Sequence, residues 1–153
     1  MLTEYIKTKI GLTMKEKNNE REALDFSFLH GKEESVIQGI PESDIEIWKV
    51  KLLKKSNNKN IRFVREWIWW NLICTEADKA ALLKEGIIPT ALYSHDLIWD
   101  ESGAFTPGWS VKTSLLEKFE EECLFITRNT IYVLVGPGRQ SDIDPRVFNS
   151  IHF

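Results

Sequence analysis

The sequence predicts an α+β fold: a single domain with one mostly antiparallel β-sheet, curled towards a small barrel, and two or three short helices. Three observations support this prediction. Apolar and polar residues alternate in several short segments, which is the period of a β-strand. Residues that typically begin and end helices enclose only short segments, which indicates short helices. Asn, Gly and Pro separate neighbouring segments, as turns between antiparallel strands require.

Length and composition indicate one domain over residues 1–153. A chain of this length buries roughly 68–70% of the surface of its unfolded state, and 42% hydrophobic residues with six Trp supply a core. We divide it into a less readable N-terminal region at 1–46, a sheet and helix core at 47–139 and a tail at 140–153. No apolar run approaches the roughly 20 residues of a membrane span, and the N-terminus lacks a secretory signal. We therefore expect a cytoplasmic protein without membrane contact.

The N-terminal region gives few signals. Thr13 and Glu16 have the spacing of a capping box, and apolar residues up to Gly31 could form one helix face or a short strand. A turn is expected at residues 39–43. After it, residues 48–53 and 61–70 alternate on either side of the polar loop 56–60, which predicts a long β-hairpin. Trp67, Trp69 and Trp70 lie in an apolar run and are expected in the core.

The middle of the chain predicts a helix, a strand and a second helix. Thr75 is expected to cap a helix by accepting from the Asp78 amide, and Gly86 suits the left-handed position after its end. Pro89 restarts an extended segment in which Ala91, Tyr93, His95, Leu97 and Trp99 share one face. Residues 114–123 are expected to form two or three helical turns.

The last predicted elements are a hairpin and a turn. Residues 125–127 and 131–135 alternate around Arg128 and Asn129, which indicates a tight hairpin because Asn tolerates positive φ. The sequence from Gly136 to Arg139 lacks the Lys-Ser/Thr pair and the helix of a phosphate loop. We interpret it as a turn that ends the last strand.

Charge is distributed unevenly. Residues 15–46 and 75–123 are acidic, whereas residues 47–74 carry seven basic side chains and one acid, Glu66. The basic segment could lie against acidic neighbours or form a contact patch. The candidate binding residues are the seven basic side chains and two acids before them: Lys49, Lys51, Lys54, Lys55, Lys59, Arg62, Arg65, Glu33 and Glu34.

Catalytic candidates are few. His95 and Asp96 have suitable side chains for acid–base work, but adjacent strand residues point to opposite faces, so they do not form a pair. Cys74 and Cys123 have no partner His in view, and two buried reduced thiols fit a reducing compartment. His30 and His152 stand alone. No residue set predicts a catalytic centre, a metal site or a cofactor.

Part of the chain resembles a known family. The residues that carry the resemblance are those at 67–70 (WIWW), 93–96 (YSHD), 109–114 (WSVKTS), 125–134 (FITRNTIYVL) and 136–138 (GPG). Over residues 66–139 the chain resembles a family of small uncharacterised proteins from bacteriophages and prophages of proteobacteria, whereas residues 1–60 match nothing we can place. The resemblance implies a protein of a mobile element in the bacterial cytoplasm. Small acidic phage proteins often bind host machinery, including defence nucleases and CRISPR complexes.

Three functions of different class follow. The first, which we favour, is a non-enzymatic binding protein that engages a host protein or ribonucleoprotein complex, as an anti-CRISPR-like inhibitor of bacterial defence would. Its acidic stretches could imitate nucleic-acid phosphates or meet a basic groove. The second is a nucleic-acid-binding module that uses the basic hairpin 49–65. The third is a small enzyme centred on His95 or Cys123. A homodimer is left open by the sequence.

Overall fold

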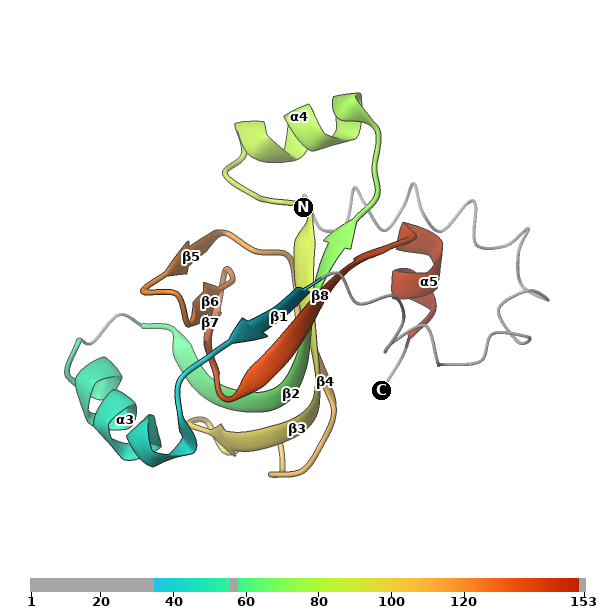
Figure 1. Cartoon of the computed structure of the whole chain (residues 1–153). Coiled ribbons are helices and arrows are strands. Elements are labelled where there is room, and N and C mark those ends of the chain that lie inside the picture. The colour runs from blue at the N-terminus through green and yellow to red at the C-terminus, as the bar shows by residue number, and fades with distance from the viewer. Residues whose placement is uncertain (1–34, 56–57, 152–153) are drawn as a thin grey trace.

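The computed structural model describes residues 35–55 and 58–151 (Figure 1). The predicted helix between Thr13 and Gly31, with Glu33, Glu34, His30 and His152, lies outside the described residues. The elements, in chain order, are β1 (Ser35–Gln38), the 3-10 turn η2 (Glu42–Asp44), α3 (Ile45–Lys54), β2 (Asn60–Leu72), α4 (Glu76–Lys84), β3 (Thr90–Asp100), β4 (Val111–Lys112), β5 (Lys118–Glu120), β6 (Leu124–Ile126), β7 (Thr130–Leu134), β8 (Pro137–Ile143) and α5 (Pro145–Ser150).

The described strands form one eight-stranded, strongly curved sheet around β2 (Figure 1). Strand β3 pairs antiparallel along one edge of β2. The opposite edge of β2 pairs first with β7 and then with β8, both in parallel. The other ladders are antiparallel: β1 on β8, β4 on β3, β5 on β6 and β6 on β7. The predicted α+β class with short helices and a curled, mostly antiparallel sheet is therefore confirmed, with two parallel pairings that were not predicted.

The predicted hairpin of residues 48–53 and 61–70 is wrong in its first half, because residues 45–54 form helix α3. Ile45, Trp48 and Leu52 follow the spacing i, i+3, i+7, which places them on one helix face. Leu52 is only 2% exposed, and the other two pack beside it against the sheet. Over so few residues, the sequence fits both the period of a strand and the period of a helix. The helix forms because it buries this face against the sheet.

Helix α4 and strand β3 follow the prediction. The Thr75 hydroxyl accepts a hydrogen bond of 3.0 Å from the Asp78 amide, and Gly86 has a φ of 75° after the helix ends. Strand β3 then begins at Thr90. Local capping chemistry is thus sufficient to fix this part of the chain.

The helix predicted for residues 114–123 is absent, since this segment is extended and then turns into the β5–β6 hairpin. Leu115 and Leu116 are both buried although they are adjacent in sequence. Leu116 exchanges backbone hydrogen bonds with Ile88 and Thr90, so its peptide groups are satisfied across the sheet. Glu121 and Glu122, with φ of 51° and 60°, make the turn. Pairing with the rest of the sheet therefore overrides the helix preference of this segment.

For the C-terminal part of the chain, the predicted hairpin is confirmed, whereas the predicted final turn and tail are wrong. The β6–β7 hairpin closes through a 2.9 Å bond from the Thr127 amide to the Thr130 carbonyl, although Asn129 is not among the described residues with positive φ. Gly136 does not end the sheet: the chain bends there, at a φ of 72°, and continues as β8. Residues 140–151, predicted as a tail, form the end of β8 and α5. Asp144 caps α5 by accepting from the Arg146 amide.

The apolar core contains Trp67 and Trp70, each 1% exposed, as predicted. Helix α3 covers the core around Phe63 and Val133, whereas α5 covers the core around Trp70. No helix among the described residues is long and apolar enough to cross a membrane.

Candidate functional site

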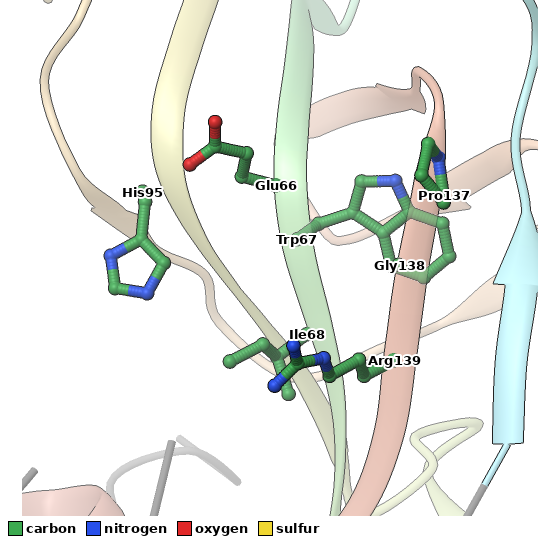
Figure 2. Close-up of a pocket in the computed structure, with 7 residues that line it drawn as sticks. All are labelled: Glu66, Trp67, Ile68, His95, Pro137, Gly138 and Arg139. Atoms are coloured by element: carbon green, nitrogen blue, oxygen red, sulfur yellow. The ribbon is translucent and has the colours of Figure 1, made fainter. Parts of the chain in front are cut away.

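A pocket of about 400 Å³ lies where β2 changes partner from β7 to β8. Figure 2 shows its lining: three consecutive residues of β2, one of β3 and three of β8. These residues are Glu66, Trp67, Ile68, His95, Pro137, Gly138 and Arg139. An acid, an imidazole and a guanidinium from three strands thus meet around one apolar hollow.

The backbone of β2 is irregular at this pocket. Val64 and Trp67 pack in the same core cluster although an odd number of positions separates them. In a regular strand they would face opposite sides of the sheet. Between them Glu66 has a φ of 51°, a conformation that costs a non-glycine residue free energy. The alternation of side chains along β2 therefore changes phase at Glu66.

Strand β3 changes phase opposite the same point. Leu92 and Leu97 belong to one cluster although they are five positions apart, whereas Tyr93 belongs to another. The prediction that Ala91, Tyr93, His95, Leu97 and Trp99 share one face is therefore wrong for Leu97. The separation of His95 from Asp96 is confirmed: the His95 ring packs edge-on against Tyr93 at 4.8 Å between centroids, and Asp96 faces Arg65.

Two interactions hold the irregular ladder together. The Ser94 hydroxyl donates to the Arg65 carbonyl oxygen at 2.7 Å and accepts from the Asp96 amide at 3.0 Å. The Asp96 carboxylate accepts from Arg65 Nε at 2.7 Å, and this bond raises the pKa of Arg65 further. A side-chain hydroxyl thus replaces hydrogen bonds that a regular ladder would make.

The opposite edge of β2 is interrupted at the same level. The β2–β7 ladder ends at Val64 and Leu134, and the β2–β8 ladder begins at Ile68 and Arg139. The indole of Trp67 fills the gap, and its Nε1 donates to the Val135 carbonyl oxygen at 3.2 Å. Gly138 lies against the indole so closely that a Cβ would stand 2.2 Å from it. The pocket therefore depends on glycine at position 138.

The lining suits binding better than covalent chemistry. The described lining residues include no serine, threonine, cysteine or lysine, the side chains that most often act as nucleophiles. The described part of the chain also contains no group of three or more metal-ligating side chains. Glu66 is exposed, Arg139 and His95 are half-buried, and the remaining lining is apolar apart from backbone. Sequence reasoning missed Glu66 and Arg139 because β-strand periodicity gives no sign of a phase change at a glutamate.

The basic residues predicted as a binding patch are mostly paired within the protein. On α3, Lys51 and Lys55 lie 2.8 and 3.7 Å from the carboxylate of Glu121, and the hydrogen bond from Lys51 lowers the pKa of Glu121. Lys49 lies 3.3 Å from Glu46 and over the Trp99 ring. These contacts favour the interpretation in which the basic segment lies against acidic neighbours.

The basic residues of β2 and its approach are also paired. Lys59 donates to the carbonyl oxygens of Thr127 and Arg128, at 2.6 and 2.7 Å, and so holds the β6–β7 turn. Arg62 Nε lies 3.3 Å from the buried Asp100 carboxylate. Arg65 pairs with Asp96 and Glu42. Within the part of the chain that the structure describes, Lys54 is the one of these seven residues without an ion pair.

Neither cysteine supports a nucleophile. Cys123 is 3% exposed, and burial, with the charge of Glu121 as a smaller cause, raises the pKa of its thiol to about 11. Burial also raises the pKa of Cys74. A thiol with a raised pKa is mostly protonated at neutral pH, and the protonated form is a poor nucleophile.

A second feature is the outer face of α3. Ile47, Val50 and Leu53 are 65%, 54% and 48% exposed. They follow one another at intervals of three, which places them side by side along the helix. Lys54 and Lys55 lie at the same end of the helix as Leu53. The alternation of residues 48–53 predicted a strand, and a strand has no such face.

Comparison with known proteins gives one match. A family model described as a domain of unknown function, DUF6957, matches residues 38–150. No curated protein and no solved structure matches the chain. The matched residues include α3, the described residues that line the pocket, and α5. Because the match covers most of the sequence, the chain belongs to the DUF6957 family.

Proposed function

We propose that this chain is a non-enzymatic binding protein of phage or prophage origin that acts in the cytoplasm of a bacterial host by occupying a host macromolecular complex, as an inhibitor of bacterial defence would. The phage context rests on the resemblance of residues 66–139. The contact surface we propose is the outer face of α3. The observation that carries the proposal is the exposure of Ile47, Val50 and Leu53 on one short helix.

The chemistry of this face defines the partner. Aliphatic side chains in a row along a helix are the usual anchors of a helix that docks in an apolar groove. Lys51 and Lys55 beside the row are paired with Glu121, which leaves Lys54 at the end of the helix as the cation that could meet a carboxylate of the partner. A host protein with an apolar groove and a carboxylate at one end of it therefore fits this face better than a nucleic acid does.

The nucleic-acid alternative is less well supported. It requires free cationic side chains, whereas Lys51, Lys59, Arg62 and Arg65 have acidic or carbonyl partners within the protein. Binding to DNA or RNA that weakens steeply with salt, and that is lost on reversing the charges of Lys54 and Lys55, would favour this alternative.

The test is affinity capture from host lysate with mass spectrometry, run in parallel on a nuclease-treated sample. Val50→Glu keeps a good helix former but places a carboxylate in the apolar row. Leu83→Glu is the matched control, because Leu83 is 52% exposed on α4. We expect one host protein to be recovered by the wild type and by Leu83→Glu, with or without nuclease, and to be lost with Val50→Glu. Equal recovery by all three proteins, or no specific partner, would contradict the proposal.

A further inference from the structure

We infer that the pocket between β2, β3 and β8 binds a small organic anion: a carboxylate or phosphate group carried on an apolar or planar body, with Arg139 as the partner of the anionic group. This site is separate from the outer face of α3 and does not depend on the function proposed above. The lining of the pocket, its size and the irregular backbone around it support this assignment.

Charge determines the class of ligand. Among the described lining residues, Arg139 and His95 can present N–H donors to an anion, and Glu66 is the one carboxylate. A guanidinium is charged at all ordinary pH values and offers parallel donors that match carboxylate or phosphate oxygens. Figure 2 shows the Arg139 guanidinium beside Ile68, with His95 and Glu66 on the β3 side of the same hollow. An anionic group is therefore the best partner for this lining.

The remaining lining determines what carries the anion. Trp67, Ile68 and Pro137 supply apolar surface around the charged groups. A volume of about 400 Å³ lies in the range of pockets that enclose small organic ligands. A bare inorganic ion would leave most of this surface in contact with water. Glu66 can accept a hydrogen bond from a donor group on the body of the ligand.

Specific side-chain contacts hold the irregular backbone around the pocket. Glu66 holds a left-handed conformation inside a 13-residue strand, which costs free energy. The Ser94 hydroxyl and the Trp67 indole each donate a hydrogen bond to a backbone carbonyl oxygen beside this point, and Gly138 leaves the room that the indole occupies. The β2–β3 register is kept through this point, with Arg65 opposite Asp96 and Trp67 opposite Ser94. The positive φ of Glu66 therefore changes the direction of its side chain, and Glu66 lines the pocket together with Arg139 and His95.

The experiment is isothermal titration calorimetry on the full chain with four probes: phenyl phosphate, phenylacetate, phenylacetamide and inorganic phosphate. We expect phenyl phosphate or phenylacetate to bind, and the stronger of the two identifies the anionic group. The uncharged amide and the inorganic ion should bind about tenfold more weakly or worse, because the amide lacks the anionic group and the inorganic ion lacks the apolar ring. Equal binding of the amide, or no binding of either organic anion, would overturn the inference.

Two variants and one spectrum locate the site. Arg139→Gln should weaken binding of the organic anion about tenfold or more, since it removes a charge-assisted contact. Arg128→Gln, on the exposed β6–β7 turn, is the matched control and should bind like the wild type. If Arg139→Gln does not fold, ¹⁵N spectra of the wild type give the same information. The Trp67 indole N–H and the Arg139 amide should shift on titration, and shifts confined to other residues would overturn the inference.

Discussion

The hydroxyl of Ser94 donates a 2.7 Å hydrogen bond to the carbonyl oxygen of Arg65, at the level where β2 and β3 both change phase. It also accepts from the Asp96 amide, so one side chain satisfies two backbone groups in a buried position. Ser94 is 1% exposed, and water cannot easily replace it. The irregular segment around Glu66 therefore depends on this serine.

Ser94→Ala should lower the free energy of unfolding by about 1–3 kcal/mol, because it removes the hydrogen-bond partner of a partly buried carbonyl oxygen and a partly buried amide. Urea denaturation followed by Trp fluorescence measures the change. Ser114→Ala, at an exposed serine, should change stability by less than about 0.5 kcal/mol. Similar values for the two variants would show that the Ser94 hydroxyl is dispensable.

Gly138→Ala should destabilise the protein by about 1–3 kcal/mol or more, as overpacking does. The added Cβ would stand 2.2–2.4 Å from three atoms of the Trp67 indole, so the ring or β8 must move. Gly86→Ala is the control: a Cβ there meets nothing within 4 Å, and only its positive φ costs free energy. Thermal unfolding should place Gly138→Ala below Gly86→Ala, and the reverse order would refute the close packing at Gly138.

Asp100 should make the free energy of unfolding depend on pH in the acid range. Burial alone would raise the pKa of this carboxyl, but hydrogen bonds from Asn60, the Phe105 amide and Ser102, with the charge of Arg62, lower it from 3.8 to about 2. A lowered folded-state pKa stabilises the protein above pH 3.8, and the stabilisation is lost as pH falls from there through 2. The shift corresponds to about 2 kcal/mol.

Comparison of the wild type with Asp100→Asn isolates this contribution. The difference in free energy of unfolding should be about 2 kcal/mol at pH 6 and should shrink as pH falls towards 2. Asp142→Asn, at an exposed aspartate of β8, is the control for the loss of one carboxylate. A difference for Asp100→Asn that stays constant across this pH range would contradict the lowered pKa.

The two thiols should differ in reactivity. With a pKa of about 11, roughly one Cys123 thiol in ten thousand is ionised at pH 7, and the side chain is buried. Cys74 is half-buried. Mass spectrometry during iodoacetamide treatment of the native protein should show Cys74 modified first and Cys123 only after unfolding. Early modification of Cys123 would revive the enzyme hypothesis centred on it.

The sequence by itself determined the elements whose ends carry local chemistry. Thr75 and Gly86 frame α4 because a hydroxyl cap and a left-handed glycine act within a few residues. Strand β3 and the β6–β7 hairpin follow from short-range alternation and from the turn at Arg128 and Asn129. Trp67 and Trp70 are buried, as expected for side chains in an apolar run, because exposing such a run to water costs free energy.

Tertiary structure alone decided the features that depend on contacts between distant segments. Residues 45–54 fit a strand or a helix, and packing of Leu52 against the sheet selected the helix. Residues 114–123 lost their helix to pairing with Ile88 and β6. The pocket arises in part from the parallel pairing of β2 with β8, about 70 positions away in the sequence. It also depends on the left-handed conformation of Glu66, which no residue near it in the sequence predicts. Hydrogen bonds of Ser94 and Trp67 to backbone carbonyl oxygens stabilise this region, and Gly138 makes room for the Trp67 indole. These residues come from three strands that only the folded chain brings together.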